Sequence, residues 1–488
     1  MVSPPQNFDT GIPSFNVLLA GGLPARQSII VTGTPGSGKT VLCSQVAFAA
    51  AARGMPVVAV TVTSEPHDKL VEALSGFSFH NPELLGDKLF LISAYSALKR
   101  GAKEARELLL QTVRERGARL LFIDGLRSIR DLWQDEARLR EFLYELGLGL
   151  AALNCIGMFT TEYPLPRLME LPEATTMDGI VAVSVQSQGS RRLRRVEVVK
   201  LRGRPHLQGE HVMRITTEGV DFLPRLEATL PDVPEAPLDQ ERRGFGLPEL
   251  DSLMYGGFPS NSATLIAGSL GIGKTLLASY FALDGARHGE KSLFVSFFDS
   301  PERVISRAKR VGLDMRPAYE SGMLEIIQEL PAEVEADVLI RRIIQRIEER
   351  GVKRLVLDGL AELEHSIMES GRRRAFLSSL ALRLRQLGVT SLFTREVSKV
   401  VGTELDFSDS PVAILAENIL LLRFVELHGR LHRILSILKM RDSKYDSTLR
   451  EFEVADSGLR VLAPMRSSQG LLTGQARPVG TTIGGSET

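Results

Sequence analysis

Short apolar runs alternate with longer amphipathic segments along most of the 488-residue chain. In the first half, five runs rich in β-branched or large apolar residues have the length of buried strands, and segments of helical periodicity separate most of them. These runs are 28–32, 57–62, 88–92, 120–124 and 156–160. Strands that alternate with helices in this way predict an α/β fold with a mostly parallel β-sheet flanked by helices.

Two further strand-like runs follow in the first half, at 179–185 and 196–200. Because they come after the alternating βα pattern, we expect them as antiparallel additions at one edge of the sheet. A basic cluster, Arg191-Arg192-Leu193-Arg194-Arg195, directly precedes the second run. We interpret it as the solvated face of an edge strand, and the alternative is that it lines a surface or channel of an assembly.

The second half of the chain repeats the first. Lys39 and Lys274 are 235 residues apart (274 − 39). The same offset relates four further pairs: Gly11 and Gly246, Pro13 and Pro248, Gly22 and Gly257, and Pro24 and Pro259. One offset shared by several motifs indicates a duplicated domain.

The repeat and local composition divide the chain into five parts. A segment with three prolines among acidic residues indicates a linker, and the last residues are rich in Ser, Gly and Thr, which is typical of disorder. The expected parts are a disordered arm at 1–7, a first ATP-binding domain at 8–225, a linker at 226–243, a second ATP-binding domain at 244–464 and a disordered tail at 465–488.

Each half carries one phosphate-binding pattern, GxxxxGK[ST], between a predicted strand and a predicted helix. The two copies are Gly33, Thr34, Pro35, Gly36, Ser37, Gly38, Lys39 and Thr40, and Gly268, Ser269, Leu270, Gly271, Ile272, Gly273, Lys274 and Thr275. In this P-loop setting the glycines let backbone N–H groups face a polyphosphate, and the lysine reaches the β- and γ-phosphates. The threonine hydroxyl can ligate Mg²⁺, so the sequence predicts two sites for ATP with Mg²⁺.

An aspartate ends the fourth apolar run of each half. Asp124 follows 120–123, and Asp358 follows 354–357. In a P-loop fold this carboxylate lies beside the loop and helps its threonine to hold Mg²⁺. A strand-terminal aspartate can instead cap the next helix. Its recurrence at an offset of 234 residues (358 − 124) favours the Mg²⁺ role.

Composition narrows the class of protein. Lys+Arg and Asp+Glu both number 59, so no net charge draws the chain to nucleic acid or to an anionic membrane. No apolar run approaches the roughly 18 residues that span a bilayer, and the N-terminus lacks the apolar core of a signal peptide. The two cysteines, Cys43 and Cys155, are too few for a disulfide framework, which fits the reducing cytoplasm.

With these motifs the sequence resembles the RecA-like P-loop ATPases and, among them, the KaiC family of double-domain proteins. The likeness covers nearly the whole chain. It rests on both P-loops, on the Asp-Gly-Leu after the fourth strand of each half, on 21–24 and 256–259 (Gly-Gly-Leu-Pro and Gly-Gly-Phe-Pro), and on 200–203 and 439–442. It implies two tandem RecA-like domains that bind ATP and Mg²⁺.

The resemblance also implies an assembly. In KaiC-like proteins the corresponding lysine and arginine reach across a subunit interface to the neighbour's nucleotide. Lys200, Arg202, Lys439 and Arg441 are therefore candidate ATP ligands in a homo-oligomer, expected as a hexameric ring. A cation from a neighbour neutralises γ-phosphate charge and couples binding to assembly. The alternative is a solvated charge pair on an edge strand.

The sequence departs from the family at the residues that act on the attacking water. KaiC-like domains usually carry two adjacent glutamates after the second strand, and the aligned residues here are Thr63-Ser64 and Phe298-Asp299. Hydroxyls are too weakly basic for this work, and a phenyl ring has no such group. Glu65, one residue beyond the aligned pair, and Asp299, with its shorter reach, remain as candidate catalytic residues. We expect slow hydrolysis in the second domain and slower hydrolysis in the first.

A second departure concerns phosphorylation. Clock members of the family receive phosphate on a Ser-Thr pair in the second domain, whereas the aligned residues here are Val412-Ala413-Ile414-Leu415. These side chains have no hydroxyl, which argues against clock-type autophosphorylation.

The leading interpretation is a KaiC-like ATP-binding protein with weak ATPase activity and a signalling or regulatory role, read by partner proteins that the sequence does not identify. One alternative is a non-hydrolysing scaffold gated by nucleotide. Another is a RecA/RadA-like DNA-handling ATPase. That activity would call for a basic module or a zinc motif, which neither the net charge nor the cysteine spacing supports.

Overall fold

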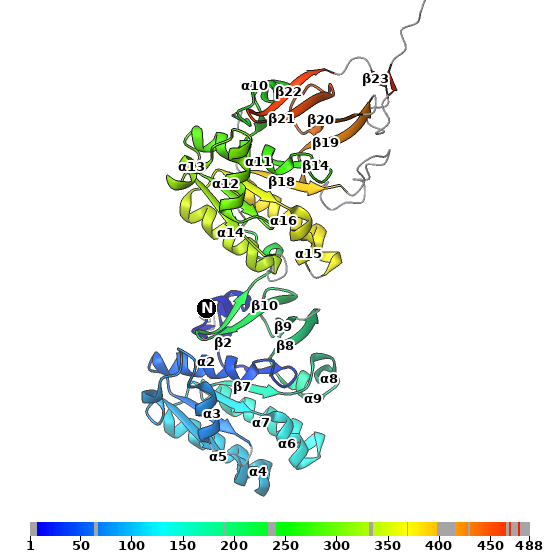
Figure 1. Cartoon of the computed structure of the whole chain (residues 1–488). Coiled ribbons are helices and arrows are strands. Elements are labelled where there is room, and N and C mark those ends of the chain that lie inside the picture. Colours follow the sequence, from blue (N-terminus) through cyan, green and yellow to red (C-terminus); the bar gives the residue numbers. More distant parts are fainter. Residues whose placement is uncertain are drawn as a thin grey trace, which may run out of the picture. The chain divides into compact units, whose positions relative to one another are not determined.

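A computed structural model describes residues 7–62, 67–188, 191–232, 241–330, 335–367, 369–397, 415–427, 430–464, 468–469 and 477–478. The chain forms two compact units, Met1–Ala228 and Thr229–Thr488 (Figure 1). Over the described residues each unit contains one nine-stranded sheet, and helices follow most of its parallel strands. The predicted fold class, two tandem α/β domains of RecA-like type with mostly parallel sheets, is confirmed.

The first unit begins with a small antiparallel pair formed by its first two strands, which its first helix connects, and then alternates strands and helices. Its strands are β1 (Asn7–Phe8), β2 (Leu23–Pro24), β3 (Ser28–Thr32), β4 (Val57–Thr61), β5 (Leu89–Ser93), β6 (Leu120–Asp124), β7 (Ile156–Thr161), β8 (Gly179–Gln188), β9 (Arg191–Leu201), β10 (Glu210–Thr216) and β11 (Gly219–Leu223). Its α-helices are α1 (Pro13–Leu18), α2 (Lys39–Ala52), α3 (His67–Leu74), α4 (Tyr95–Arg100), α5 (Ala102–Arg116), α6 (Leu126–Trp133), α7 (Glu136–Ala152), α8 (Leu165–Met169) and α9 (Pro172–Thr176).

The second unit repeats this order. Its strands are β12 (Arg242–Arg243), β13 (Phe258–Pro259), β14 (Ala263–Gly268), β15 (Ser292–Ser296), β16 (Leu324–Gln328), β17 (Arg354–Asp358), β18 (Thr390–Glu396), β19 (Asn418–Leu427), β20 (Arg430–Met440), β21 (Arg450–Ala455) and β22 (Gly458–Pro464). Its α-helices are α10 (Pro248–Leu253), α11 (Lys274–Arg287), α12 (Pro301–Arg310), α13 (Arg316–Glu320), α14 (Ala336–Arg350), α15 (Leu360–Ser366) and α16 (Arg373–Gln386).

The two sheets share one strand order. It is β11-β10-β9-β8-β3-β7-β6-β4-β5 in the first unit and, read from the same end, β22-β21-β20-β19-β14-β18-β17-β15-β16 in the second. The strand before each P-loop therefore lies in the middle of its sheet. The strand that ends in Asp124 or Asp358 lies two places away, beyond β7 or β18.

The sheet of the first unit is buried on both faces. Ile29 and Val31 of β3 belong to one apolar cluster, which includes Leu42 of α2, whereas Ile30 belongs to another, which includes Leu143 of α7. Because successive strand residues point to opposite faces, this division places α2 and α7 against opposite sides of the sheet. Burial on both faces explains why the parallel strands appear as continuous apolar runs.

Two expectations about the edge of this sheet are wrong. The run 179–185 belongs to β8, which pairs in parallel with β3, and antiparallel pairing begins only at β9. Helices α8 and α9 lie between β7 and β8 and provide the crossover that a parallel strand needs. The basic cluster is not on an edge strand, because β10 and β11 extend the sheet beyond β9, and the Arg195 side chain is only 4% exposed.

Parts of the expected domain boundaries lie outside the described residues. These are 1–6 of the arm, 233–240 of the linker and most of 465–488. Within the expected linker range, Leu226–Ala228 forms a 3-10 turn, and Arg242–Arg243 is strand β12, which pairs with β13. Of the expected tail, Ser468–Gln469 and Arg477–Pro478 form the small pair β23 and β24. In the part of the chain that the structure covers, no helix is long and apolar enough to cross a membrane.

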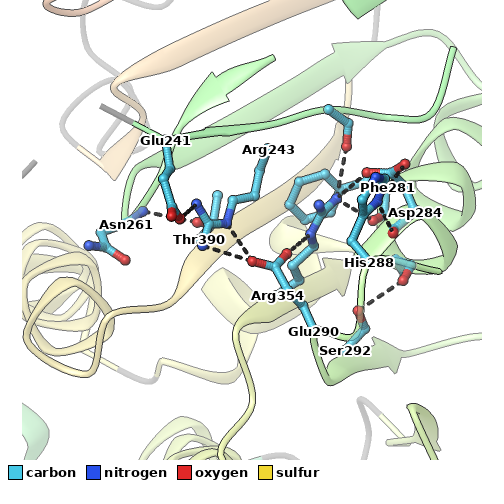
Figure 2. A network of polar contacts seen from close by, with 12 residues as sticks. Glu241, Arg243, Asn261, Phe281, Asp284, His288, Glu290, Ser292, Arg354 and Thr390 are labelled. Carbon is cyan, nitrogen blue, oxygen red and sulfur yellow. Dashed lines mark hydrogen bonds and ion pairs between the residues drawn. The ribbon is translucent and has the colours of Figure 1, made fainter. Parts of the chain in front are cut away.

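A buried ionic network fixes the strand that carries Asp358 (Figure 2). Arg354, the first residue of β17, is 3% exposed, and its Nε donates to Glu290 at 2.7 Å. Its Nη1 lies 3.0 Å from a carboxylate oxygen of Asp284 on α11 and donates to the Gly244 carbonyl at 2.8 Å. The other Glu290 oxygen accepts from Arg243. One guanidinium thus ties the P-loop helix, the strand and the start of the second unit together.

Replacing Arg354 by alanine is expected to lower the free energy of unfolding of the second unit by about 3–5 kcal/mol, because the buried Asp284 would lose its guanidinium partner and Glu290 would keep only Arg243. A urea titration followed by circular dichroism measures this change. Trp133, the single tryptophan, lies in the first unit, so its fluorescence identifies the transition that should not move. Arg310→Ala, at an exposed position of α12, is the matched control. A loss below about 1 kcal/mol in Arg354→Ala would contradict the assigned role.

Candidate functional site

Both P-loops lie between a central strand and a helix, as their spacing predicts. The first connects β3 to α2, and the second connects β14 to α11. Gly38 and Gly273 precede these helices with φ values of 107° and 117°, a left-handed conformation that favours glycine. A Cβ on Gly33 would lie 2.0 Å from the Val183 carbonyl oxygen. The loops therefore need glycine at these positions, and each directs a helix N-terminus, a favourable site for an anion, toward the loop.

The P-loop lysines donate to carbonyls of their own loops. Lys39 Nζ lies 3.0 Å from the Thr34 oxygen. Lys274 Nζ lies 2.9 and 2.8 Å from the oxygens of Gly268 and Ser269. These bonds hold both ammonium groups at the loop, where a phosphate can approach them.

Burial makes these ammonium groups costly. It lowers the pKa of Lys274, against the opposing effects of the negative charges of Glu396 and Asp358. Burial lowers the pKa of Lys39 in the same way, with Glu162 as the strongest opposing charge. A polyphosphate bound in either loop would add negative charge beside the lysine and favour its charged form.

The strand-end aspartates lie beside the loop threonines. Thr40 Oγ1 donates to Asp124 Oδ2 at 3.1 Å, and Thr275 Oγ1 donates to Asp358 Oδ2 at 2.9 Å. The structure thus brings together in each unit the two side chains that the sequence predicts as Mg²⁺ ligands. All the groups involved are oxygens, which are the donors that Mg²⁺ prefers.

A second threonine completes each site, and the sequence analysis missed it. Thr160 of β7 donates to Asp124 Oδ1, and Thr394 of β18 donates to Asp358 Oδ1 at 2.6 Å. Thr394 Oγ1 also accepts from the Gly359 N–H at 2.9 Å, and Thr160 accepts in the same way from the glycine after Asp124. Each aspartate is therefore held by two hydroxyls. Thr160 and Thr394 are 234 residues apart, the offset of the aspartates, and that signal could have identified them.

The negative charge of the Asp358 carboxylate is destabilised by burial in the second site. Burial raises the pKa of Asp358, whereas the hydrogen bonds from Thr394 and Thr275 and the charge of Lys274 lower it. The charge of Asp299 raises it further, although as the smallest of these effects. A divalent cation beside Asp358 would stabilise the ionised carboxylate.

The loops differ at one buried position. Ser37 is fully buried, and its hydroxyl has no hydrogen-bond partner among the described residues. A buried hydroxyl without a partner inside a phosphate loop fits a ligand that supplies an acceptor. Its counterpart in the second loop is Ile272, which is also fully buried and has no polar atom in its side chain.

The candidate catalytic residues lie in different environments. Glu65 is outside the described residues. Asp299 follows β15 and lies near Asp358, but Arg307 Nη1 contacts its Oδ2 at 2.6 Å. Phe298, which precedes Asp299 in the expected position of the glutamate pair, carries an apolar ring and is 62% exposed.

Within a single chain, the two candidate interface lysines contact main-chain carbonyls, and the two candidate interface arginines are exposed to solvent. Lys200 Nζ donates to the Met177 carbonyl at 2.7 Å, and Lys439 Nζ donates to the Ala416 carbonyl at 2.8 Å. Arg202 is exposed and pairs with Asp178 at 3.1 Å. Arg441 is exposed in the turn after β20. The two arginines therefore present most of their charge outward.

Comparison with known proteins covers both units. The family model described as "ATPase: KaiC" matches residues 8–227 and 244–466. A "Circadian clock protein KaiC3" from a Synechocystis species is 29% identical, over 96% of this chain and 94% of that protein. A "Circadian clock oscillator protein KaiC 1" from the same source is 27% identical, over 96% and 91%. A "Circadian clock oscillator protein KaiC" from Thermosynechococcus vestitus is 28% identical over the same shares.

Replacing Thr394 by valine tests how much the hydroxyl of this strand threonine stabilises the second unit. Valine keeps the shape but leaves the Gly359 N–H without its acceptor and Asp358 with one donor fewer. We expect the free energy of unfolding of the second unit to fall by about 1–3 kcal/mol, measured by urea titration. Thr394→Ser keeps the hydroxyl and should lose no more than about 0.8 kcal/mol, the value of one methyl group. Equal losses in the two variants would show that the hydroxyl contributes nothing.

Proposed function

The chain belongs to the KaiC family of ATPases, and on that premise we propose that it binds Mg-ATP at both P-loops, hydrolyses it slowly and uses it as a regulatory ligand. One observation carries the proposal. In each unit a P-loop threonine, a strand-end aspartate and a threonine of the neighbouring strand form one hydrogen-bonded group beside the loop lysine. Two copies of this arrangement support two nucleotide sites.

The phosphate-binding role falls to the loop itself. Lys39 and Lys274 would exchange their carbonyl partners for phosphate oxygens, which are stronger acceptors because they are charged. The first-turn N–H groups of α2 and α11 have no partner within their own helices and would donate to the same anion. In the first unit the Ser37 hydroxyl would gain the acceptor that it lacks.

Thr40 with Asp124, and Thr275 with Asp358, would hold Mg²⁺ beside the phosphates. The bound ion would neutralise charge on the phosphate oxygens. Each aspartate also accepts hydrogen bonds from two threonines, which fix the direction of its carboxylate. Fixed ligands favour metal binding because less ordering is required when the ion arrives.

Slow hydrolysis follows from the residues near the expected position of the attacking water. Phe298 cannot accept a proton, and Asp299, the neighbouring carboxylate, is paired with Arg307. The same features support the alternative that the second site holds ATP without turnover and acts as a nucleotide-gated scaffold. Neither reading includes clock-type autophosphorylation, since the aligned residues 412–415 carry no hydroxyl.

For assembly we propose a homo-oligomer, a hexameric ring, in which Arg202 and Arg441 approach the nucleotide of a neighbouring chain. The exposure of both arginines supports this role. Lys200 and Lys439 would first have to leave the main-chain carbonyls that they now contact. The ring would act in the cytoplasm and report its nucleotide state to partner proteins. Neutral net charge makes nucleic acid a poor candidate for such a partner.

We expect the wild-type chain to bind ATP at both P-loops in the presence of Mg²⁺, and Lys39→Ala and Lys274→Ala each to weaken one site by about 30-fold or more, the effect of truncating one partner of a desolvated charge pair. Equilibrium dialysis with labelled ATP measures the stoichiometry. Lys99→Ala and Lys309→Ala, at exposed helical positions, are the controls.

The same variants assign turnover to a site. Loss of hydrolysis mainly in Lys274→Ala would support a slow second-unit ATPase. An unchanged stoichiometry in both P-loop variants would contradict nucleotide binding at the P-loops. ATP binding without hydrolysis in the wild type would instead support the alternative of a nucleotide-gated scaffold.

Assembly makes a separate prediction. Light scattering is expected to show a larger mass with Mg-ATP than without it, because nucleotide at a subunit boundary stabilises the oligomer. Arg441→Ala should reduce this increase and leave ATP binding by the single chain intact. Arg460→Ala, at an exposed position of β22, should behave as wild type. A single-chain mass with ATP bound at both sites would contradict the ring.

A further inference from the structure

Asp299 lies at the carboxyl ends of the parallel strands, where the second site also lies. It follows β15 by three residues, and β15 pairs in parallel with β17, with Ser296 opposite Asp358. The Asp299 N–H donates to Ser296 Oγ at 3.0 Å, which fixes the start of the loop. The carboxyl ends of these two neighbouring strands thus bring Asp299 and Asp358 to the same side of the site.

Arg307 holds the Asp299 carboxylate from the other side. Its Nη1 donates to Oδ2 at 2.6 Å and its Nη2 to Oδ1 at 3.3 Å, a two-point pair that orients the carboxylate as well as attracting it. Arg303, one turn earlier on α12, adds a weaker contact at 3.7 Å. The Asp299 side chain is 12% exposed and that of Arg307 is 56% exposed, so the pair is closed on the aspartate side and open on the arginine side.

This pairing conflicts with the work of a general base. A base must direct a free lone pair at the water that it deprotonates. Here each Asp299 oxygen accepts from the Arg307 guanidinium, and this two-point pair fixes the direction of the lone pairs that remain. The carboxylate is therefore present near the site but engaged elsewhere.

We infer that the Arg307–Asp299 ion pair acts as a clamp that restrains ATP hydrolysis at the second P-loop, and that release of Arg307 frees Asp299 to act on the attacking water. The inference rests on the proposed function of that site. In the released state Asp299 takes a proton from water while the water oxygen bonds to the γ-phosphorus. The bond from that phosphorus to the β–γ bridging oxygen breaks, which gives ADP and inorganic phosphate. Arg307 is a positioning residue in this scheme, since it acts only through Asp299.

The first unit does not repeat the Arg307 side of the clamp in its sequence. The residue 235 positions before Arg307 is Glu72, on α3 of the first unit, and its charge has the opposite sign. Because the Arg307 side chain is more than half exposed, an acidic group of a binding partner could compete with Asp299 for it. The restraint is thus placed where another protein can remove it.

Full-length Arg307→Ala tests the clamp. A general base contributes about 10²–10⁴-fold to a rate, and for a short-reach aspartate we expect kcat for ATP hydrolysis to rise by about 10-fold or more. The KM for ATP should change by less than about twofold, since Arg307 acts on the aspartate and not on the nucleotide. The double variant Arg307→Ala with Asp299→Asn should lose the gain, and Arg307→Lys, which keeps the charge but not the two-point contact, should lie between wild type and Arg307→Ala.

Arg310→Ala removes an arginine of the same helix that is not among the partners of Asp299 in the described chain, and it should match wild type. Arg307→Gln provides the same test if the alanine variant does not fold. An unchanged or lower kcat in a folded Arg307 variant that still binds ATP would overturn the clamp, as would a gain that persists without Asp299. Failure of the wild type to bind ATP at the second loop would instead overturn the proposed function itself.

Discussion

The hydrogen bonds to one carboxylate organise each site, and in the second unit this carboxylate is buried. Asp358 accepts from Thr275 of the P-loop helix and from Thr394 of the neighbouring strand, and Asp124 accepts from Thr40 and Thr160. A buried carboxylate with too few donors is costly, so each member of the group constrains the others. The P-loop helix, the strand that ends in aspartate and the strand between them must therefore meet at one point. The parallel order of each sheet satisfies this requirement, because it aligns the carboxyl ends of these strands.

Without nucleotide, the charged forms of Lys274 and Asp358 in the second site are destabilised by their burial. Burial lowers the pKa of Lys274 and raises that of Asp358, so both groups are less stable when charged than they would be in water. A bound phosphate would stabilise the lysine, and a bound cation would stabilise the aspartate. Ligands that bind only the folded state raise its stability. Arg354, on the strand that ends in Asp358, pairs with Asp284 of the P-loop helix, so the elements that carry the site are also joined by the buried ion pair.

How far the sequence predicts this arrangement depends on the range of each interaction. The parallel strands and the P-loops are evident because burial on both faces gives continuous apolar runs and because the loop spacing is local. The hydrogen bonds of Thr160 and Thr394 to the aspartates could not be predicted, because a threonine in a strand resembles any other β-forming residue until the neighbouring strand is known. Only the register of β17 and β18, which places Asp358 opposite Thr394, identifies the neighbour. The direction of β8 was predicted wrongly, since a crossover through two five-residue helices leaves little periodic signal. The Arg307–Asp299 pair joins a loop to the far end of a ten-residue helix, a spacing that no local pattern singles out.

The two units show which parts of the repeat depend on one another. The lysine, the threonine, the aspartate and the second threonine occur in both units, and all four contact one another or the loop through hydrogen bonds. Residues outside this group differ: Ser37 of the first unit corresponds in sequence to Ile272 of the second, and Glu72 corresponds to Arg307. A change within the hydrogen-bonded group removes a donor or an acceptor from its other members, whereas Ser37 and Arg307 lie outside that group, so a substitution there leaves these hydrogen bonds intact. This difference in cost explains how one duplicated fold can keep the same hydrogen-bonded group in both units and still differ at the residues around it.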